Sequence, residues 1–328
     1  MQEILDLGRL GFELSRYSGS WVGFKIVTNV SDEVGTADVD PDRLVIVDPG
    51  FEFQGKPWRA THGMVKFPPW GLQMEHELIN GRLEAARAFG AANGLNRVTV
   101  NPADAWLGIA ATGKTYYDLR EALTALGLDD AALNRYGIRL LHLRMPFPIA
   151  PALIRDFARG LEELLVVEEK RSFIELQIRE VLADDAVRPR ITGKRDTDDQ
   201  PLVPAYGELD ADAIALVLAR RLERRLTLPG IAAHAALLEA LRERPAPITL
   251  ARGAWFCSGC PHNRSTVVPE GSLAGGGIGC HSMAMTMDRQ TFGVTQMGGE
   301  GAHWVGASLF TETPHFFQNL GDGTFAHS

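Results

Sequence analysis

The runs IRLLHL, residues 138–143, and LLVVE, residues 164–168, decide the fold. Both are almost continuously apolar, which is typical of strands whose sheet is covered by helices on both faces. A further strand is expected over 106–111 and another over 97–100. Segments with helical periodicity alternate with these strands, and they span residues 115–127, 150–161 and 172–182. This alternation predicts an α/β domain with a parallel sheet at residues 96–184.

Four further regions surround this domain. Residues 1–35 carry a helix over 2–17 and a β-rich run, WVGFKIVT, which predicts a strand over 21–28. The remaining regions are a connector with a long helix over 73–92 (residues 36–95), a polar linker followed by two helices (185–250) and a glycine-rich domain (251–328).

Composition excludes several classes of protein. The chain has 328 residues, 45% of them hydrophobic and 23% charged, with a formal net charge of -8. These values are ordinary for a folded protein, and the acidic balance favours neither nucleic acid nor an anionic membrane as a partner. No apolar run approaches the ~18 residues of a membrane span, and no signal peptide is visible. We therefore expect a cytoplasmic protein.

The three cysteines form the first chemical motif. Cys257-Ser-Gly-Cys260 is followed by Cys280, and three clustered thiols favour a metal or redox site over disulfide bonds. Thiolates suit zinc or an iron–sulfur cluster, but both usually need four ligands. His262 or His281 would complete a zinc site. Buried reduced cysteines and a redox dithiol at Cys257 and Cys260 remain open alternatives.

Gly321-Asp322-Gly323 forms a second motif near the end of the chain. A carboxylate after a strand, flanked by glycines that let phosphate groups come close, suits Mg²⁺ bound to a diphosphate. Taken alone, Asp-Gly is also one of the commonest turns. The motif therefore gains meaning only beside the other glycine-rich segments.

Two such segments precede it, GGGIGCHS at 275–282 and MGGEG at 297–301. The first would let a cofactor approach the backbone, or would form a flexible hairpin. In the second, Glu300 could orient a neighbouring group, but we expect it to be a solvated turn carboxylate. His142, within the strand at 138–143, is expected to be a satisfied core histidine.

Together, CSGCPH, GGGIGCHS, MGGEGAHWVGAS and FQNLGDGTFAHS, in this order, resemble the thiamine-diphosphate part of the 2-oxoacid:ferredoxin oxidoreductases, and most closely the indolepyruvate ferredoxin oxidoreductases. The start of the chain resembles the end of that family's pyrimidine-binding domain. LLVVEEKRSFIELQIREVL resembles its transketolase-C-like domain. The resemblance implies an α/β fold with a transketolase-C-like parallel sheet and partial, doubly wound thiamine-diphosphate-binding domains.

The resemblance also implies roles for individual residues. Cys257, Cys260 and Cys280 would be three ligands of a [4Fe–4S] cluster. Asp322 would bind Mg²⁺ and, through it, the diphosphate. The residues bordering the cofactor would be Ile278, Gly279, Cys280, His281, Gly321, Asp322 and Gly323. No catalytic residue is predicted, because the family's activating glutamate has no counterpart in this chain.

The implied activity is oxidative decarboxylation of a 2-oxoacid, such as indolepyruvate or another aryl pyruvate, to its acyl-CoA. Coenzyme A and ferredoxin would be partners, and the full-length protein would be a homodimer. The chain resembles a fragment that begins and ends inside domains, so we expect it to be inactive alone. Two alternatives are a thiamine-dependent decarboxylase or synthase without a cluster, and a non-enzymatic zinc-binding module.

Overall fold

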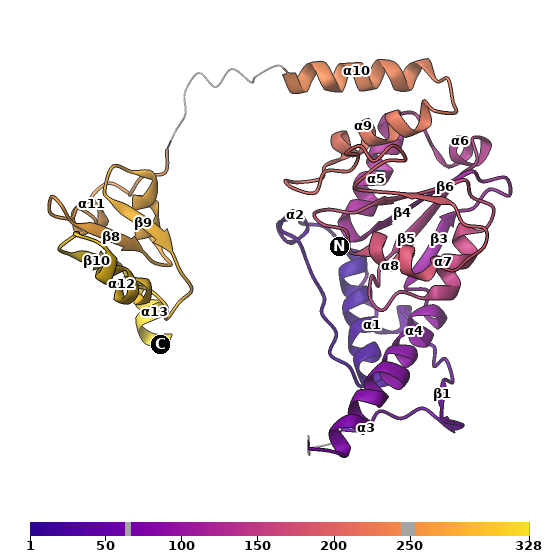
Figure 1. Cartoon of the computed structure of the whole chain (residues 1–328), viewed down its shortest axis with the longest axis horizontal. Helices are drawn as coiled ribbons and strands as arrows, with labels where there is room; N and C mark the ends of the chain where they lie inside the picture. Colours follow the sequence, from indigo (N-terminus) through magenta and orange to yellow (C-terminus); the bar gives the residue numbers. More distant parts are fainter. Residues whose placement is uncertain (63–66, 244–252, 328) are drawn as a thin grey trace. The chain divides into compact units, whose positions relative to one another are not determined.

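The computed structural model describes residues 1–62, 67–243 and 253–327 (Figure 1). The chain divides into two compact units, Met1–Arg244 and Pro245–Ser328. Each unit has its own sheet, mostly parallel in the first unit and parallel in the second. No helix of the described residues is long and apolar enough to cross a membrane.

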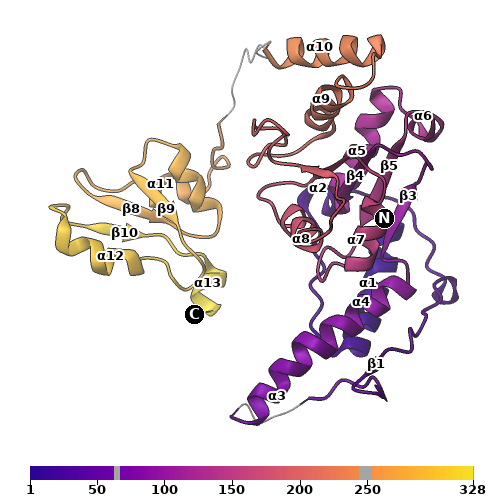
Figure 2. The same ribbon diagram turned by 45° about the vertical axis from the view of Figure 1, so that its right-hand side comes forward.

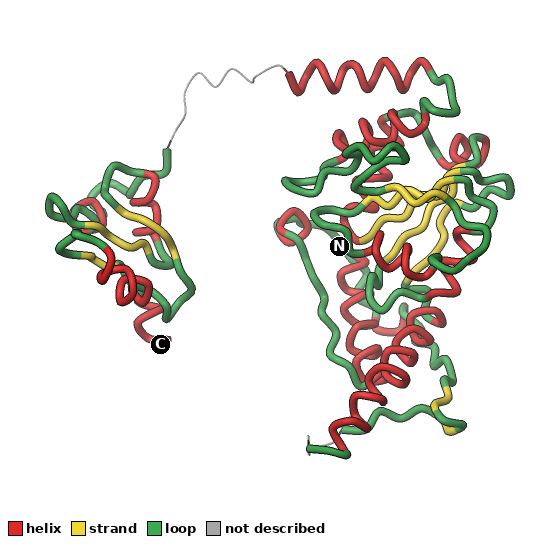
Figure 3. Tube along the Cα trace, in the orientation of Figure 1, coloured by secondary structure: helices red, strands yellow, loops and turns green. Residues whose placement is uncertain are grey.

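The sheet of the first unit has five strands in the order β3-β5-β4-β6-β7. All neighbouring pairs are parallel except β3, which runs antiparallel to β5 at one edge. Figure 3 shows this sheet in yellow between helices. The strands are β3 (Asn96–Val100), β4 (Leu107–Thr112), β5 (Ile138–Leu143), β6 (Glu163–Val167) and β7 (Arg190–Thr192).

Helices cover both faces of this sheet because the central strands are apolar on both sides. Ile109 and Leu165 belong to a core cluster on one face, whereas Ala110 and Val166 belong to a cluster on the other. The first face is covered by α5 (Gly113–Ala125), α6 (Asp130–Arg135) and α9 (Ala211–Leu222). The second face is covered by α7 (Pro151–Ala158) and α8 (Ile174–Val181). A further helix, α10 (Pro229–Glu243), packs on α9.

A separate helical core lies beside the sheet (Figure 2). The predicted helix over 73–92 is one continuous run of α3 (Trp70–Glu77), the π-helical turn η2 (Leu78–Arg82) and α4 (Leu83–Ala92). Its α4 part packs Phe89 against Leu10 and Leu14 of α1 (Gln2–Ser18). The short elements between them are α2 (Thr28–Ser31), η1 (Pro41–Arg43), β1 (Glu52–Phe53) and β2 (Lys56–Pro57).

The predicted strand over 21–28 is wrong. Residues 21–27 form no regular element, and no strand of the described chain lies alongside them. Trp21, Phe24 and Ile26 are exposed. Their β propensity had suggested a strand, but a strand forms only where a neighbour supplies hydrogen bonds and a packing surface.

The polar linker predicted at the start of residues 185–250 contains β7, which pairs with β6. A buried ion pair stabilises the same region: Arg221 of α9 donates from Nε to the carboxylate of Glu163 at 2.8 Å. The Thr192 hydroxyl of β7 donates to the same carboxylate at 2.7 Å. The sequence around β7 is polar because this strand lies at the edge of the sheet, and the polar sequence therefore suggested a linker.

Glu168 lies directly after β6 and caps α8. Its carboxylate accepts hydrogen bonds from the backbone N–H groups of Phe173 (3.0 Å), Ile174 (2.8 Å) and Glu175 (3.1 Å). These N–H groups have no partner within the helix, and a negative charge is favourable at a helix N-terminus. The side chain is buried as a consequence.

The second unit holds a three-stranded parallel sheet in the order β10-β8-β9. Its strands are β8 (Leu273–Gly276), β9 (Thr291–Val294) and β10 (Phe316–Gln318). Its helices are α11 (His262–Ser265), η3 (Cys280–Thr286), α12 (Ala302–Ala307), η4 (Ser308–Phe310) and α13 (Asp322–His327). Of its described apolar side chains, only Phe256, Ala274 and Ala284 are buried.

The predicted α/β class is confirmed, since helices pack on a mostly parallel sheet in the first unit and a parallel sheet in the second. The strand β3 differs from the prediction, because it is antiparallel to β5. The five predicted domain ranges remain predictions. Part of the predicted boundary near residue 250 lies outside the described residues.

Candidate functional site

Three glycine-rich loops meet at one edge of the second unit's sheet. The strands β8, β9 and β10 run parallel, so their carboxyl ends lie at the same edge. Each end leads into one of the predicted segments: residues 277–280, 295–301 and 319–323. Ligands of open parallel sheets bind outside this edge. The candidate residues are separated in the sequence, and the fold brings the loops that carry them to one edge of the sheet.

Two of these loops are in close backbone contact. A Cβ at Gly321 would lie 2.5 Å from the carbonyl oxygen of Ile278, and a Cβ at Gly277 would collide with the carbonyl of Asn319. Asn319 also donates to the Gly275 carbonyl, from its backbone N–H (3.1 Å) and from Nδ2 (3.2 Å). Glycine is required at positions 277 and 321 because no side chain fits there.

Asp322 lies at the start of α13 and is exposed. Its Oδ1 accepts a hydrogen bond from the backbone N–H of Gly323 at 2.8 Å. The carboxylate keeps further lone pairs for a cation, and oxygen is the ligand that Mg²⁺ prefers. Among the described residues, no three His, Cys, Asp or Glu side chains are close enough together to hold a metal ion.

His281 is buried beside the same loop. Its Nε2 has no hydrogen-bond partner, and this atom lies 2.9 Å from where a Cβ on Gly277 would be. Burial lowers the pKa of His281, and the nearby His262 lowers it further. The imidazole is therefore neutral at pH 7, with a free nitrogen close to the backbone of the loop. An unpartnered buried polar atom is a feature to expect where a ligand is missing.

Glu300 is not the solvated turn carboxylate that the sequence predicted. It accepts hydrogen bonds from the Thr324 hydroxyl (3.0 Å) and from the Gly298 N–H (2.7 Å). Desolvation opposes ionisation, but these hydrogen bonds outweigh it, so the pKa of Glu300 lies below its usual value. Glu300 thus ties the β9 loop to α13. Both Glu300 and Thr324 lie near glycine motifs in the sequence. Their contact could not be predicted, because it depends on how the fold brings the two loops together.

The three cysteines are free thiols. Cys257 and Cys280 are exposed and Cys260 is half-buried. A turn joins the first two, because the Cys260 N–H donates to the Cys257 carbonyl at 3.1 Å. His262 Nδ1 lies 3.2 Å from the Cys260 sulfur, and its ring stacks on Phe256. The described residues bring no third thiol or imidazole to this pair in metal-binding geometry.

Comparison with known proteins locates the chain among its relatives. Residues 97–244 match the sequence model of the indolepyruvate oxidoreductase domain. The indolepyruvate oxidoreductase subunit IorA of Methanothermobacter marburgensis is 30% identical over 80% of this chain and 37% of its own length. That of Methanothermobacter thermautotrophicus is 27% identical over 100% of this chain and 50% of its own length. The chain thus spans half or less of these relatives.

A solved 2-oxoglutarate:ferredoxin oxidoreductase from Magnetococcus marinus aligns with 56% of this chain and 30% of its own, at 16% identity and a TM-score of 0.33. This structural likeness is too low to carry an argument. The sequence matches confirm the resemblance drawn from the motifs: this chain is similar to indolepyruvate oxidoreductase proteins over part of their length.

Proposed function

We propose that this chain is the thiamine-diphosphate-binding part of an indolepyruvate-type 2-oxoacid:ferredoxin oxidoreductase. The complete enzyme would convert a 2-oxoacid, of which an aryl pyruvate is the best candidate, to its acyl-CoA and pass electrons to ferredoxin. One observation carries the proposal: the three glycine-rich loops lie at the carboxyl edge of one parallel sheet, with the Gly321 backbone against Ile278. The IorA relatives support the choice of substrate class.

The residues at this edge fit thiamine diphosphate with Mg²⁺. Gly277 and Gly321 let the loops after β8 and β10 pack against each other, which holds the candidate residues of both loops at one edge. The Asp322 carboxylate would hold Mg²⁺, and the unpartnered Nε2 of His281 offers one hydrogen bond to the cofactor. When bound, thiamine diphosphate supplies an electron sink for loss of carbon dioxide from a 2-oxoacid. The chain's contribution is to orient it, and Glu300 would hold the Asp322 helix in place.

The described residues do not fit a [4Fe–4S] cluster in the same way. They supply three thiols, two of them exposed, and no set of three side chains is arranged to hold a metal. The assignment of Cys257, Cys260 and Cys280 as cluster ligands therefore rests on the family resemblance.

The test of the cofactor site is binding rather than turnover. Isothermal titration with thiamine diphosphate, in the presence of Mg²⁺, would compare the wild-type chain with Asp322→Ala. Loss of the carboxylate should weaken binding by more than about tenfold. Asp288→Ala, an exposed aspartate in the same unit, is the matched control and should bind normally. Equal affinity of Asp322→Ala and wild type would contradict the proposal.

A second candidate, a zinc-binding module, is favoured by the 3.2 Å contact between Cys260 and His262. Metal analysis separates the candidates. The chain, purified without oxygen and with thiamine diphosphate and Mg²⁺, would be assayed for iron, acid-labile sulfide and zinc, beside a form extended toward the length of its relatives. Iron with sulfide in the extended form supports the oxidoreductase. Stoichiometric zinc without sulfide in both forms would favour the module, and absence of both metals would favour a cluster-free decarboxylase or synthase.

A further inference from the structure

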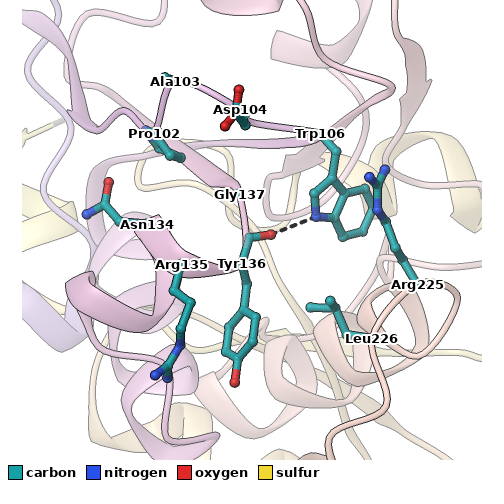
Figure 4. Close-up of a pocket in the computed structure, with 10 residues that line it drawn as sticks. All are labelled: Pro102, Ala103, Asp104, Trp106, Asn134, Arg135, Tyr136, Gly137, Arg225 and Leu226. Atoms are coloured by element: carbon teal, nitrogen blue, oxygen red, sulfur yellow. Dashed lines mark hydrogen bonds between the residues drawn. The ribbon is translucent and has the colours of Figure 1, made fainter.

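A cavity of about 330 Å³ opens in the first unit, at the amino ends of β4 and β5 (Figure 4). Trp106 directly precedes β4, and Tyr136 closely precedes β5. Leu226, which follows α9, lies opposite them. This is the edge of the sheet away from the usual ligand crevice, and it belongs to the other unit from the thiamine site. Its volume is at the low end of the range for small-molecule pockets, which suits a metabolite rather than a large cofactor.

Two guanidinium groups flank this cavity. Arg135 lies 5.0 Å from the centre of the Tyr136 ring, and Arg225 lies 5.0 Å from that of Trp106. Figure 4 shows them on opposite sides, with Trp106, Tyr136 and Leu226 between. Stacking on an aromatic ring holds each guanidinium in a fixed position.

The charges of the cavity favour an anion. Its lining contains two arginines and one carboxylate, that of Asp104. Arg225 is paired with Glu162, which lies outside the lining. Within the described part of the chain, the guanidinium of Arg135 makes no ion pair or hydrogen bond, so its donors are available to a ligand.

Much of the backbone at the back of this cavity is not available to a ligand. Many phosphate sites use free backbone N–H groups. Here the N–H groups of Trp106 and Leu107 both donate to the Gly137 carbonyl, and that of Gly137 donates to Asn134. Trp106 Nε1 is also occupied, by the Tyr136 carbonyl at 2.8 Å. The unpaired guanidinium of Arg135 remains as a side-chain donor, and its planar fork matches a carboxylate.

We infer that this cavity binds a small aromatic carboxylate. The aromatic part lies among Trp106, Tyr136 and Leu226, and the carboxylate pairs with Arg135. Arg225, on the opposite side, adds to the positive potential. The site is independent of the thiamine site.

The test titrates the full chain with indole-3-acetate as the probe, by calorimetry. Uncharged indole and inorganic phosphate serve as the comparison probes. We expect saturable binding of one indole-3-acetate per chain, with indole and phosphate each at least about tenfold weaker, because a hydrogen bond to a charged group is lost or the apolar contact is absent. Arg135→Gln should weaken the binding of indole-3-acetate by about tenfold. Arg159→Gln, an exposed arginine outside the cavity, should leave it unchanged.

Arg135→Gln also separates this cavity from other sites. Arg135 is exposed and its guanidinium is unpaired, so the variant should fold, and circular dichroism checks that it does. Indole-3-acetate bound at the thiamine site would be insensitive to the substitution. Three results would overturn the inference: no saturable binding, full affinity in Arg135→Gln, or phosphate binding as tightly as indole-3-acetate.

Discussion

His142 is a histidine whose burial has a measurable effect. It lies in β5 with 3% of its surface exposed, and its ring stacks on Tyr116 with centroids 3.9 Å apart. The predicted burial is confirmed, but its Nε2 has no partner, so it is not the fully satisfied residue that was expected. Burial lowers the pKa of His142 from 6.5 to about 4.

This pKa predicts a loss of stability in acid. The unfolded imidazole takes up a proton near pH 6.5, whereas the folded one stays neutral until about pH 4. The stability is therefore complete above pH 6.5, decreases as the pH falls and levels off below about pH 4. At pH 5 the loss attributable to His142 is about 2 kcal/mol.

Urea unfolding at pH 7 and pH 5 tests the prediction. His142→Phe keeps the stacked ring and should lose about 2 kcal/mol less than wild type between the two pH values. His76→Phe, at an exposed position, should lose as much as wild type. The same pH dependence in His142→Phe and in wild type would show that another group is responsible.

At the scale of elements, the ion pair between Glu163 and Arg221 joins α9 to the central sheet. The Arg221 side chain is 2% exposed and that of Glu163 is 11% exposed. Removal of one partner leaves an uncompensated buried charge, which typically costs about 3–5 kcal/mol. Arg221→Met should therefore lower the free energy of unfolding by about that amount.

The double variant Glu163→Gln, Arg221→Met removes both charges and keeps an acceptor for the Thr192 hydroxyl. We expect it to be more stable than Arg221→Met alone, since replacement of a whole buried pair is often neutral. Denaturant titration of the three proteins measures both effects. A double variant less stable than the single one would mean that Glu163 has a role beyond this pair.

The strands show which parts of the fold could be predicted from the sequence. The strand at 138–143 was predicted residue for residue, because a central strand is apolar on both faces and its own sequence records this burial. The strand β7 was not predicted, and residues 21–27 were wrongly predicted to be part of a strand. Both errors arise because pairing with a neighbouring strand cannot be read from the local sequence. At the candidate site, the motifs identified the glycine loops, but not the contact between Glu300 and Thr324, which lie on different loops.

At the scale of the whole molecule, the two units differ in their buried cores. In the described chain, the first unit has three apolar clusters, whereas the second buries only Phe256, Ala274 and Ala284 among its apolar side chains. Few buried contacts mean a low free energy of local opening. Hydrogen exchange followed by mass spectrometry should therefore show faster exchange in β8, β9 and β10 than in β4, β5 and β6.

A ligand that binds only the folded state should slow this exchange. Thiamine diphosphate with Mg²⁺ is expected to protect peptides from the second unit and to leave β4 to β6 unchanged. Asp322→Ala should abolish the protection. Protection in both units, or in neither, would contradict the assignment of the cofactor to the second sheet.

The carboxylate of Glu168 has a consequence for the binding of anions at the first sheet. It lies on the backbone N–H groups that a free phosphate would otherwise use, at the carboxyl end of β6. Because it is covalently attached, its effective concentration exceeds that of any dissolved competitor. The N-terminus of α8 thus holds an anion that belongs to the chain itself. A dissolved anion could bind at this end of α8 only by displacing the Glu168 carboxylate.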